Sequence, residues 1–252
     1  MDNLTATFRL YGDVLRDAAR VFPRSIVGLL LLLIAGPTLA LAGALFLGKL
    51  GIVGGFLLAL AECAVTGAYL GLVHLALEGR RTLGPRDVID TLTVYLWDVM
   101  SVKFVFWIAS LLLGRTPYFP LLLLVSAIAF SPAPELITQG RTRSFDLLAD
   151  AARFMYENWP EWLVAHLPVV AAIAAWAAAF GLPVGDALMT LMPGFGPTFD
   201  FIQVGGTLSG FGALPSVLVL AAIVHAAMVT RAVLFKRLSS SSRRSRAWKS
   251  RR

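Results

Sequence analysis

Cysteine is almost absent from this chain of 252 residues, and charged side chains are scarce. The single cysteine, Cys63, excludes an intramolecular disulfide. Only 15% of the residues are charged and 58% are apolar, which lies outside the usual composition of soluble domains. The three histidines are scattered and have no cysteine beside them, so we expect no metal and no other cofactor. No order of Ser, His and Asp typical of a hydrolase is readable, and we expect no catalytic residue and no enzyme.

Long apolar runs are what the chain has instead. A membrane-spanning helix needs about 20 mostly apolar residues. Six runs approach or exceed this length: 25–47, 52–77, 99–114, 118–137, 161–181 and 213–235. The first run starts too late and is too long for a signal peptide, and none is expected. The sequence therefore predicts an all-α integral membrane protein with six transmembrane helices.

Lysine and arginine are missing from the long connection 182–212. They cluster instead before the first run, between the second and third, between the fourth and fifth, and after the sixth. By the positive-inside rule, both termini are predicted in the cytoplasm, with residues 1–238 forming one domain of a bacterial inner membrane. The connection is too apolar for a solvated loop, so we expect short interfacial or re-entrant helices, serving as a lid or as a contact surface.

The last residues, 239–252, alternate serines with arginines and predict a disordered basic tail. Its basic residues should contact anionic lipid rather than a specific nucleic acid, since such a tail lies beside the membrane. These residues are Arg243, Arg244, Arg246, Lys249, Arg251 and Arg252. A membrane or cytoplasmic protein is a further candidate partner.

An amphipathic segment that ends near an aromatic residue precedes a long apolar run three times. The segments are 5–22, 85–97 and 144–159, and each predicts an interfacial helix before a hairpin of spans. Whether these helices contact lipid or the cytoplasmic ends of the spans stays open. Phe22 and Trp159 each precede a proline, which disfavours helix at the preceding residue, so the first and third helices should stop there.

The second copy has Asp98 where the others have proline, so we expect its helix to enter the third span with a bend or none. Phe22, Trp97 and Trp159 are the predicted anchors at headgroup depth. Lys103, a turn inside the third run, is expected to extend its amine to the nearby headgroups. Glu135 is interpreted as marking the inner end of the fourth span.

Two ionisable residues fall deep inside the apolar runs, where charge is costly. Glu62 and His225 each lie about eleven residues from the outer end of their run, hence at the same depth if the helices rise about 1.5 Å per residue. One hypothesis is that they form an intramembrane polar pair. The alternative is that Glu62 is protonated, or is bonded to Thr66 or a neighbouring helix, and only fixes packing.

Glycines four residues apart occur twice along the second run. Gly51 and Gly55 form one pair and Gly67 and Gly71 the other. Small residues at this spacing allow close helix approach, so all four are predicted to be packing positions. The second span is therefore the expected centre of the bundle.

Residues 130–159 carry a resemblance to a known group of proteins. Pro134, Gly140, Phe145, Ala152 and the pair Asn158-Trp159 follow a pattern of span end, surface helix and Asn-Trp entry into the next span. This pattern resembles the six-span bacterial proteins grouped with the glycerophosphoryl diester phosphodiesterase membrane domain and its uncharacterised relatives. The resemblance implies a membrane bundle and transfers no catalytic residue.

Three classes of function are compatible with these observations. The first is a non-enzymatic protein that assists or scaffolds the assembly or transport of membrane or envelope components, as the resemblance suggests. The second is the permease subunit of a transporter driven by a separate ATPase. The third is a lipid-modifying enzyme, for which no supporting group of residues is found.

Overall fold

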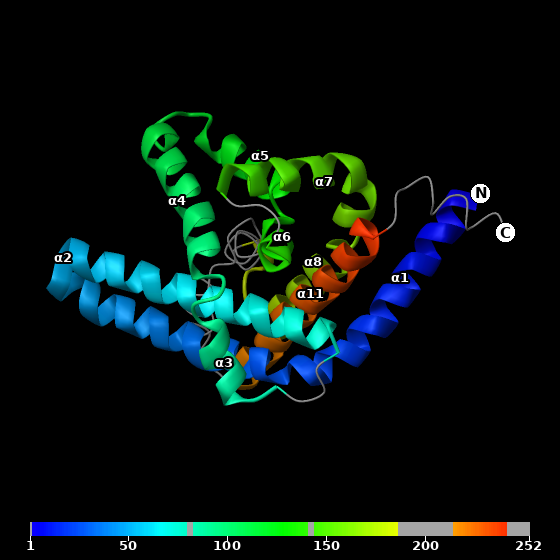
Figure 1. The fold of residues 1–252 in the computed structure, drawn as a ribbon, viewed down its shortest axis with the longest axis horizontal. Helices are drawn as coiled ribbons and strands as arrows, with labels where there is room; N and C mark the ends of the chain where they lie inside the picture. Colours follow the sequence, from blue (N-terminus) through cyan, green and yellow to red (C-terminus); the bar gives the residue numbers. More distant parts are fainter. Residues whose placement is uncertain (1, 80–82, 141–143, 186–213, 241–252) are drawn as a thin grey trace.

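The computed structural model describes residues 2–79, 83–140, 144–185 and 214–240 (Figure 1). Within these ranges every regular element is helical, which confirms the all-α prediction. The elements are α1 (Asp2–Val21), η1 (Phe22–Ser25), α2 (Ile26–Leu77), α3 (Pro85–Thr91), α4 (Leu96–Leu113), α5 (Phe119–Ala129), α6 (Ala133–Gln139), α7 (Ser144–Val164), α8 (Leu167–Ala179) and α11 (Leu214–Ser239). The connection and the basic tail predicted from the sequence lie mostly outside the described residues.

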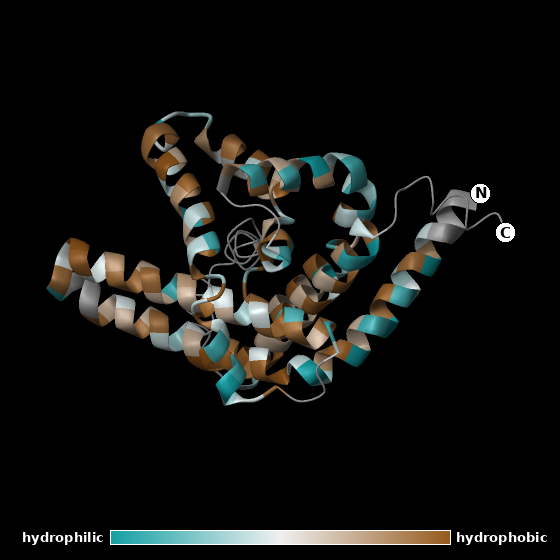
Figure 2. Ribbon diagram, viewed as in Figure 1, coloured by the Kyte–Doolittle hydropathy of each residue, from teal (hydrophilic) through white to brown (hydrophobic). Residues whose placement is uncertain are grey.

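Several helices are long and apolar enough to cross a membrane. Four helical segments in the described ranges qualify: Thr7–Leu45, Lys49–Leu77, Leu96–Leu113 and Pro215–Ser239. A fifth span arises if α7 and α8, which meet at a bend of 45°, are counted together. Figure 2 shows that apolar residues predominate along both arms of α2 and along α4. Several of their side chains are exposed, such as Ile52 (93%) and Leu112 (75%). This much exposed apolar surface indicates a membrane-embedded protein.

The run 118–137 is not a single helix. α5 has 11 residues, about 16 Å of rise, which is roughly half of a hydrocarbon core. Phe130–Pro132 separate it from α6, which has seven residues. Pro132 and Pro134 explain the break, because proline lacks the N–H that the preceding turn needs. Six spans with both termini on one side therefore stay a prediction.

α2 is a hairpin of two helical arms that turn at a single glycine. Gly51 has φ 55° and ψ −131°, a conformation that side-chain-bearing residues rarely adopt. The two arms lie side by side, with the turn far from the rest of the bundle (Figure 1). Nothing lies within 4 Å of the position that a Cβ on Gly51 would take, so its predicted role in helix packing is wrong. Gly51 is required by the turn, and Gly55 is half-buried in the returning arm.

The second glycine pair does pack closely. A Cβ on Gly67 would lie 3.2 Å from the Tyr95 carbonyl carbon, and one on Gly71 would lie 3.0 Å from Thr91 Cγ2. These contacts bring the returning arm of α2 against the turn between α3 and α4. The close approach expected at Gly67 and Gly71 is therefore present in the structure.

Gly71→Val is expected to destabilise the protein by about 1–3 kcal/mol, because the added methyl groups would overlap Thr91 and Tyr95. Gly12→Ala is the matched control, since nothing lies within 4 Å of its added Cβ in α1. Alanine at that helical position should be neutral or stabilise by about 0.5–1 kcal/mol. Thermal unfolding of both variants in one detergent measures the difference. Equal midpoints would contradict the close packing at Gly71.

The three amphipathic segments end in three different ways. α1 ends at Val21, immediately before Phe22-Pro23, as predicted. α7 is interrupted at Asn158 (φ −128°), one residue before Trp159-Pro160, close to the predicted stop, and helix resumes from there to Val164. The Asn158 amide donates to the Phe154 carbonyl at 3.0 Å, which satisfies an acceptor at the kink.

The second segment breaks earlier than expected. α3 ends at Thr91, and a turn over residues 92–95 separates it from α4. The helix therefore stops before Trp97 rather than running into the third span. Thr91 is buried at this point, with its hydroxyl donating to the Asp87 carbonyl at 2.7 Å. The close contact with Gly71 fixes this corner of the chain.

Candidate functional site

The most deeply buried charges belong to Arg231 on α11 and Glu135 on α6. Arg231 Nε donates to Glu135 Oε1 and Nη2 donates to Oε2, both at 3.1 Å. Nη2 also donates to the Ser131 carbonyl at 2.6 Å. The Trp162 ring lies 5.5 Å from the guanidinium carbon, and its indole N–H donates to Ser131 Oγ at 2.8 Å. Four side chains from three helices and a turn thus form one closed polar cluster.

The sequence patterns above do not predict this cluster. Glu135 is not only a span end, because its carboxylate is 5% exposed and paired in two places. Arg231, its partner, falls inside the sixth apolar run. The sequence does contain one signal for this pair: Arg231 and Glu135 are each isolated in an apolar run. Because a buried charge needs a partner, two such residues of opposite charge are candidates for pairing.

His225 lies in a second buried cluster, which joins three elements. The Ser25 hydroxyl donates to the Phe22 carbonyl at 3.1 Å and lies 3.0 Å from His225 Nε2, so it accepts from that nitrogen. The Tyr69 hydroxyl donates to Nδ1 at 3.0 Å. Both ring nitrogens of a neutral imidazole are satisfied by this arrangement. A Cβ on Gly28 would lie 3.2 Å from the ring, so glycine there permits the histidine to lie against α2.

The predicted anchors have different surroundings. Phe22 is half-buried and packs edge-on against His225, with the ring centroids 5.2 Å apart, and its contact with headgroups stays a prediction. Trp97 and Trp159 are 65% and 55% exposed. Their contact with headgroups stays a prediction.

Glu62 is paired with Lys103 and not with His225. Lys103 Nζ lies 2.5 Å from Glu62 Oε1, which links α4 to the returning arm of α2. The predicted pair of Glu62 and His225 is therefore wrong, since His225 is bonded to Ser25 and Tyr69. The expectation that Lys103 extends to the headgroups is wrong for the same reason. Equal depth along two helices does not place two side chains on facing sides.

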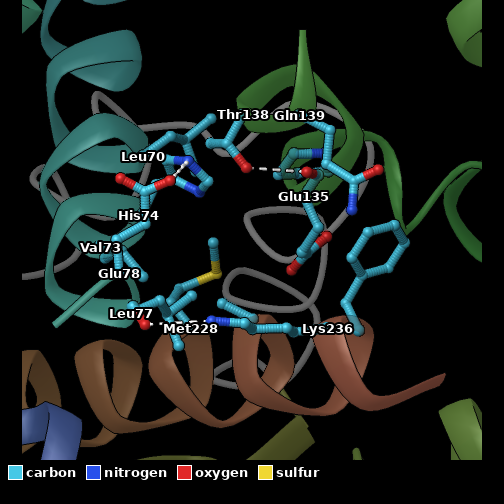
Figure 3. Close-up of a pocket in the computed structure, with 13 residues that line it drawn as sticks. Leu70, Val73, His74, Leu77, Glu78, Glu135, Thr138, Gln139, Met228 and Lys236 are labelled. Carbon is cyan, nitrogen blue, oxygen red and sulfur yellow. Dashed lines mark hydrogen bonds and ion pairs between the residues drawn. The ribbon is translucent and has the colours of Figure 1, made fainter. Parts of the chain in front are cut away.

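A pocket of about 180 Å³ opens beside the first cluster, between α2, α6 and α11 (Figure 3). His74 Nε2 lies 3.2 Å from Glu78 Oε1 at its rim, and Lys236 donates to the Leu77 carbonyl at 3.1 Å. The Glu135 carboxylate points toward the pocket but stays bonded to Arg231. The volume lies below the range of about 300–1,000 Å³ that is typical of small-molecule sites.

The pocket does not have the composition of a metal centre. Among the residues that the structure describes, no group of three or more His, Cys, Asp and Glu side chains is placed to hold a metal ion. The charges around the pocket are paired with one another or with backbone carbonyls. The polar groups around the pocket therefore serve to connect α2, α6 and α11.

A cluster of ion pairs holds α1 against the end of α11. Arg237 donates from Nη1 to Asp13 Oδ2 at 3.3 Å and from Nε to Asp17 Oδ2 at 3.2 Å. The hydrogen bond from Arg237 lowers the pKa of Asp17 below its usual value of 3.8. The contribution of Asp17 is therefore fully present above that value and is lost as the pH falls through the lowered pKa.

Arg237→Ala is expected to accelerate amide hydrogen exchange in α1 about two- to fivefold, because a partly exposed ion-pair network contributes up to about 1 kcal/mol. Arg20→Ala is the control, since Arg20 Nη1 lies 3.9 Å from Asp17 and its side chain is 69% exposed. The wild type should show the same acceleration only when the pH falls below the normal Asp pKa. Equal exchange rates in both variants would exclude Arg237 as a fastening of α1.

Comparison with protein-family models, curated proteins and solved structures finds no match to this chain. The resemblance carried by residues 130–159 is therefore neither supported nor contradicted.

Proposed function

We propose that the protein is a non-enzymatic membrane protein that assists or scaffolds the assembly or transport of membrane or envelope components. The observation that supports this proposal is that its buried polar side chains bond to one another between helices. Arg231 with Glu135, His225 with Ser25 and Tyr69, and Lys103 with Glu62 each join different helices. Groups committed to such contacts stabilise a shape and are not available to a substrate.

The hydrogen-bonded series Ser25–His225–Tyr69 has the order of nucleophile, base and orienting group that acyl-transfer enzymes use. Three features argue against that role. Ser25 and His225 are 0% exposed, and Tyr69 is equally buried. The Ser25 proton is directed at the Phe22 carbonyl. Ser25 lines neither of the two pockets described among the placed residues.

The proposed orientation places both termini in the cytoplasm of a bacterial inner membrane, as the distribution of basic residues supports. A Cys63→Ala background allows single cysteines to be introduced and labelled with a membrane-impermeant thiol reagent. In spheroplasts, Lys49→Cys near the α2 turn should react, and Gly12→Cys in α1 should not. Labelling of Gly12→Cys alone would reverse the orientation.

Affinity purification of the full-length protein from its native membrane tests the proposed function. Mass spectrometry of co-purified proteins should show envelope or membrane assembly proteins, and Ser25→Ala should capture the same set. A stoichiometric ATPase would contradict the proposal and support the permease alternative. Lipid turnover by the purified protein that is lost in Ser25→Ala would establish the enzyme alternative.

A further inference from the structure

Helices α1 and α7 each leave one long face exposed. α1 packs on α11 through buried side chains such as Val14, Ala18 and Val21. α7 packs on α4, α5 and α6 through buried side chains such as Leu147 and Phe154. Both helices lie away from the α2 turn (Figure 1). Copies of the chain that share one membrane therefore carry these two helices on the same side of it.

The outer face of α1 is apolar along one edge and basic along the other. Phe8 (73% exposed) and Leu15 (60%) lie on the apolar edge. The exposed side chains of Arg9, Arg16 and Arg20 lie on the basic edge. At 3.6 residues per turn, all five fall within about 140° of the helix circumference, so one partner helix can contact both edges.

The outer face of α7 has the same layout with the opposite charge. Its apolar edge carries three exposed aromatic side chains, Phe145, Tyr156 and Trp159. Its charged edge carries Asp146, Asp150, Arg153 and Glu157, which are exposed except for the half-buried Asp150. Exposed apolar side chains that gather beside polar ones are typical of a contact surface. The partner that fits this surface is apolar along one edge and basic along the other, as α1 is.

The charges of the two helices match when the helices are antiparallel. When two helices of this layout face each other, apolar edge meets apolar edge and charged edge meets charged edge only if they run in opposite directions. Placing Phe8 beside Trp159 then sets Arg9 against Glu157, Asp13 against Arg153, Arg16 against Asp150 and Arg20 against Asp146. Each of these pairs has opposite charge. A parallel arrangement would instead set Asp13 against Asp150 and Arg16 against Arg153, which are pairs of like charge.

A lipid surface does not fit both faces. Anionic headgroups attract the arginines of α1, but they repel the acidic edge of α7. Within one copy the two faces do not cover each other, since Phe8, Phe145 and Tyr156 are all exposed. The bonds from Arg237 to Asp13 and Asp17 hold α1 on α11 in this position. A second copy of the chain offers the complementary face to both helices.

We propose that α1 of one copy of this chain packs antiparallel against α7 of a second copy, through these two outer faces. Every copy carries both faces, so the contact repeats from copy to copy in a closed assembly. This inference goes beyond the proposed function, because it identifies a second copy of the chain as a partner.

Disulfide cross-linking in membrane vesicles tests the contact and its direction. Two full-length forms with different affinity tags are co-expressed, both in a Cys63→Ala background. Phe8→Cys in one form and Trp159→Cys in the other should give, on mild oxidation, a cross-linked dimer that carries both tags. Phe8→Cys with Phe145→Cys is the matched control and should give at least tenfold less dimer, because Phe145 lies about 20 Å from Trp159 along α7.

Exchange of charges tests the pairing of the charged edges. Arg9→Glu should raise the dissociation constant of the assembly about three- to tenfold, measured by sedimentation equilibrium in one detergent. Adding Glu157→Arg should restore the wild-type value, since the antiparallel arrangement sets these two positions against each other. Adding Asp146→Arg should not restore it, because Asp146 is set against Arg20. All three positions are exposed, so the thermal unfolding midpoints of the variants should stay equal.

Two results would overturn the proposal: a wild type that stays monomeric at every concentration, or equal cross-linking of both cysteine pairs. Equal recovery by Glu157→Arg and Asp146→Arg would overturn the antiparallel arrangement. Cross-linking without capture of assembly proteins would contradict only the proposed function. Capture of those proteins by a monomer would contradict only the self-association.

Discussion

Glu135→Leu is expected to destabilise the protein by about 3–5 kcal/mol, because the Arg231 guanidinium would stay buried without its carboxylate. Arg231 is 3% exposed, so water does not replace the lost partner. The remaining bond to the Ser131 carbonyl and the contact with Trp162 offset only part of the charge. Thermal unfolding in a single detergent, compared with wild type, measures the effect.

The double variant Glu135→Leu/Arg231→Met tests whether the loss of stability comes from an unpaired Arg231 charge or from the loss of the Glu135 side chain itself. Apolar side chains of similar size can replace a buried ion pair at little cost, so this variant should recover most of the loss. Glu78→Gln is the surface control and should change stability by less than about 1 kcal/mol, since its carboxylate is 58% exposed and pairs with His74. A double variant as unstable as Glu135→Leu would contradict the ion pair as the cause.

Lys103→Met is expected to cost about 3 kcal/mol, because it leaves the buried Glu62 carboxylate without its ion-pair partner. The combination Glu62→Gln/Lys103→Met should be clearly less destabilising than the sum of the single changes. Glu62→Gln/His225→Gln should be additive within about 0.5 kcal/mol, since the two residues have separate partners. Chemical or thermal unfolding of all single and double variants gives the free energies of unfolding needed for both double-mutant cycles. Additivity for Glu62 and Lys103 would exclude their coupling.

The pairing of Glu62 with Lys103 illustrates which part of the site the sequence could predict. An isolated acid in an apolar run indicates a buried partner, and Glu62 does have one. Counting residues gives a position along a helix axis, and on that basis His225 was the natural choice. The partner depends on how helices are rotated and crossed, which comes from packing. Gly67 and Gly71 bring α4 against α2 and therefore place Lys103 within reach.

The helices are easier to predict from the sequence than the buried polar contacts, because a helix depends on residues that are neighbours in the chain. A run of apolar residues predicts a helix wherever it lies, and Phe22-Pro23 correctly predicts where α1 ends. The same rule indicates an interruption at Trp159-Pro160, and α7 does leave helical geometry one residue earlier, at Asn158, before helix resumes to Val164. Pro132 and Pro134 were also visible in the sequence. They divide the fourth run into α5 and α6, which apolar content alone does not predict.

The single-glycine turn at Gly51 bears on how the chain enters the membrane during synthesis. The two arms of α2 are joined with almost no polar connection to carry across the bilayer. The arms can therefore pair while still leaving the translocation machinery, and integrate in one step rather than one after the other. Integration of residues 26–77 would then not wait for the rest of the chain. The later helices would assemble on a hairpin that is already in place.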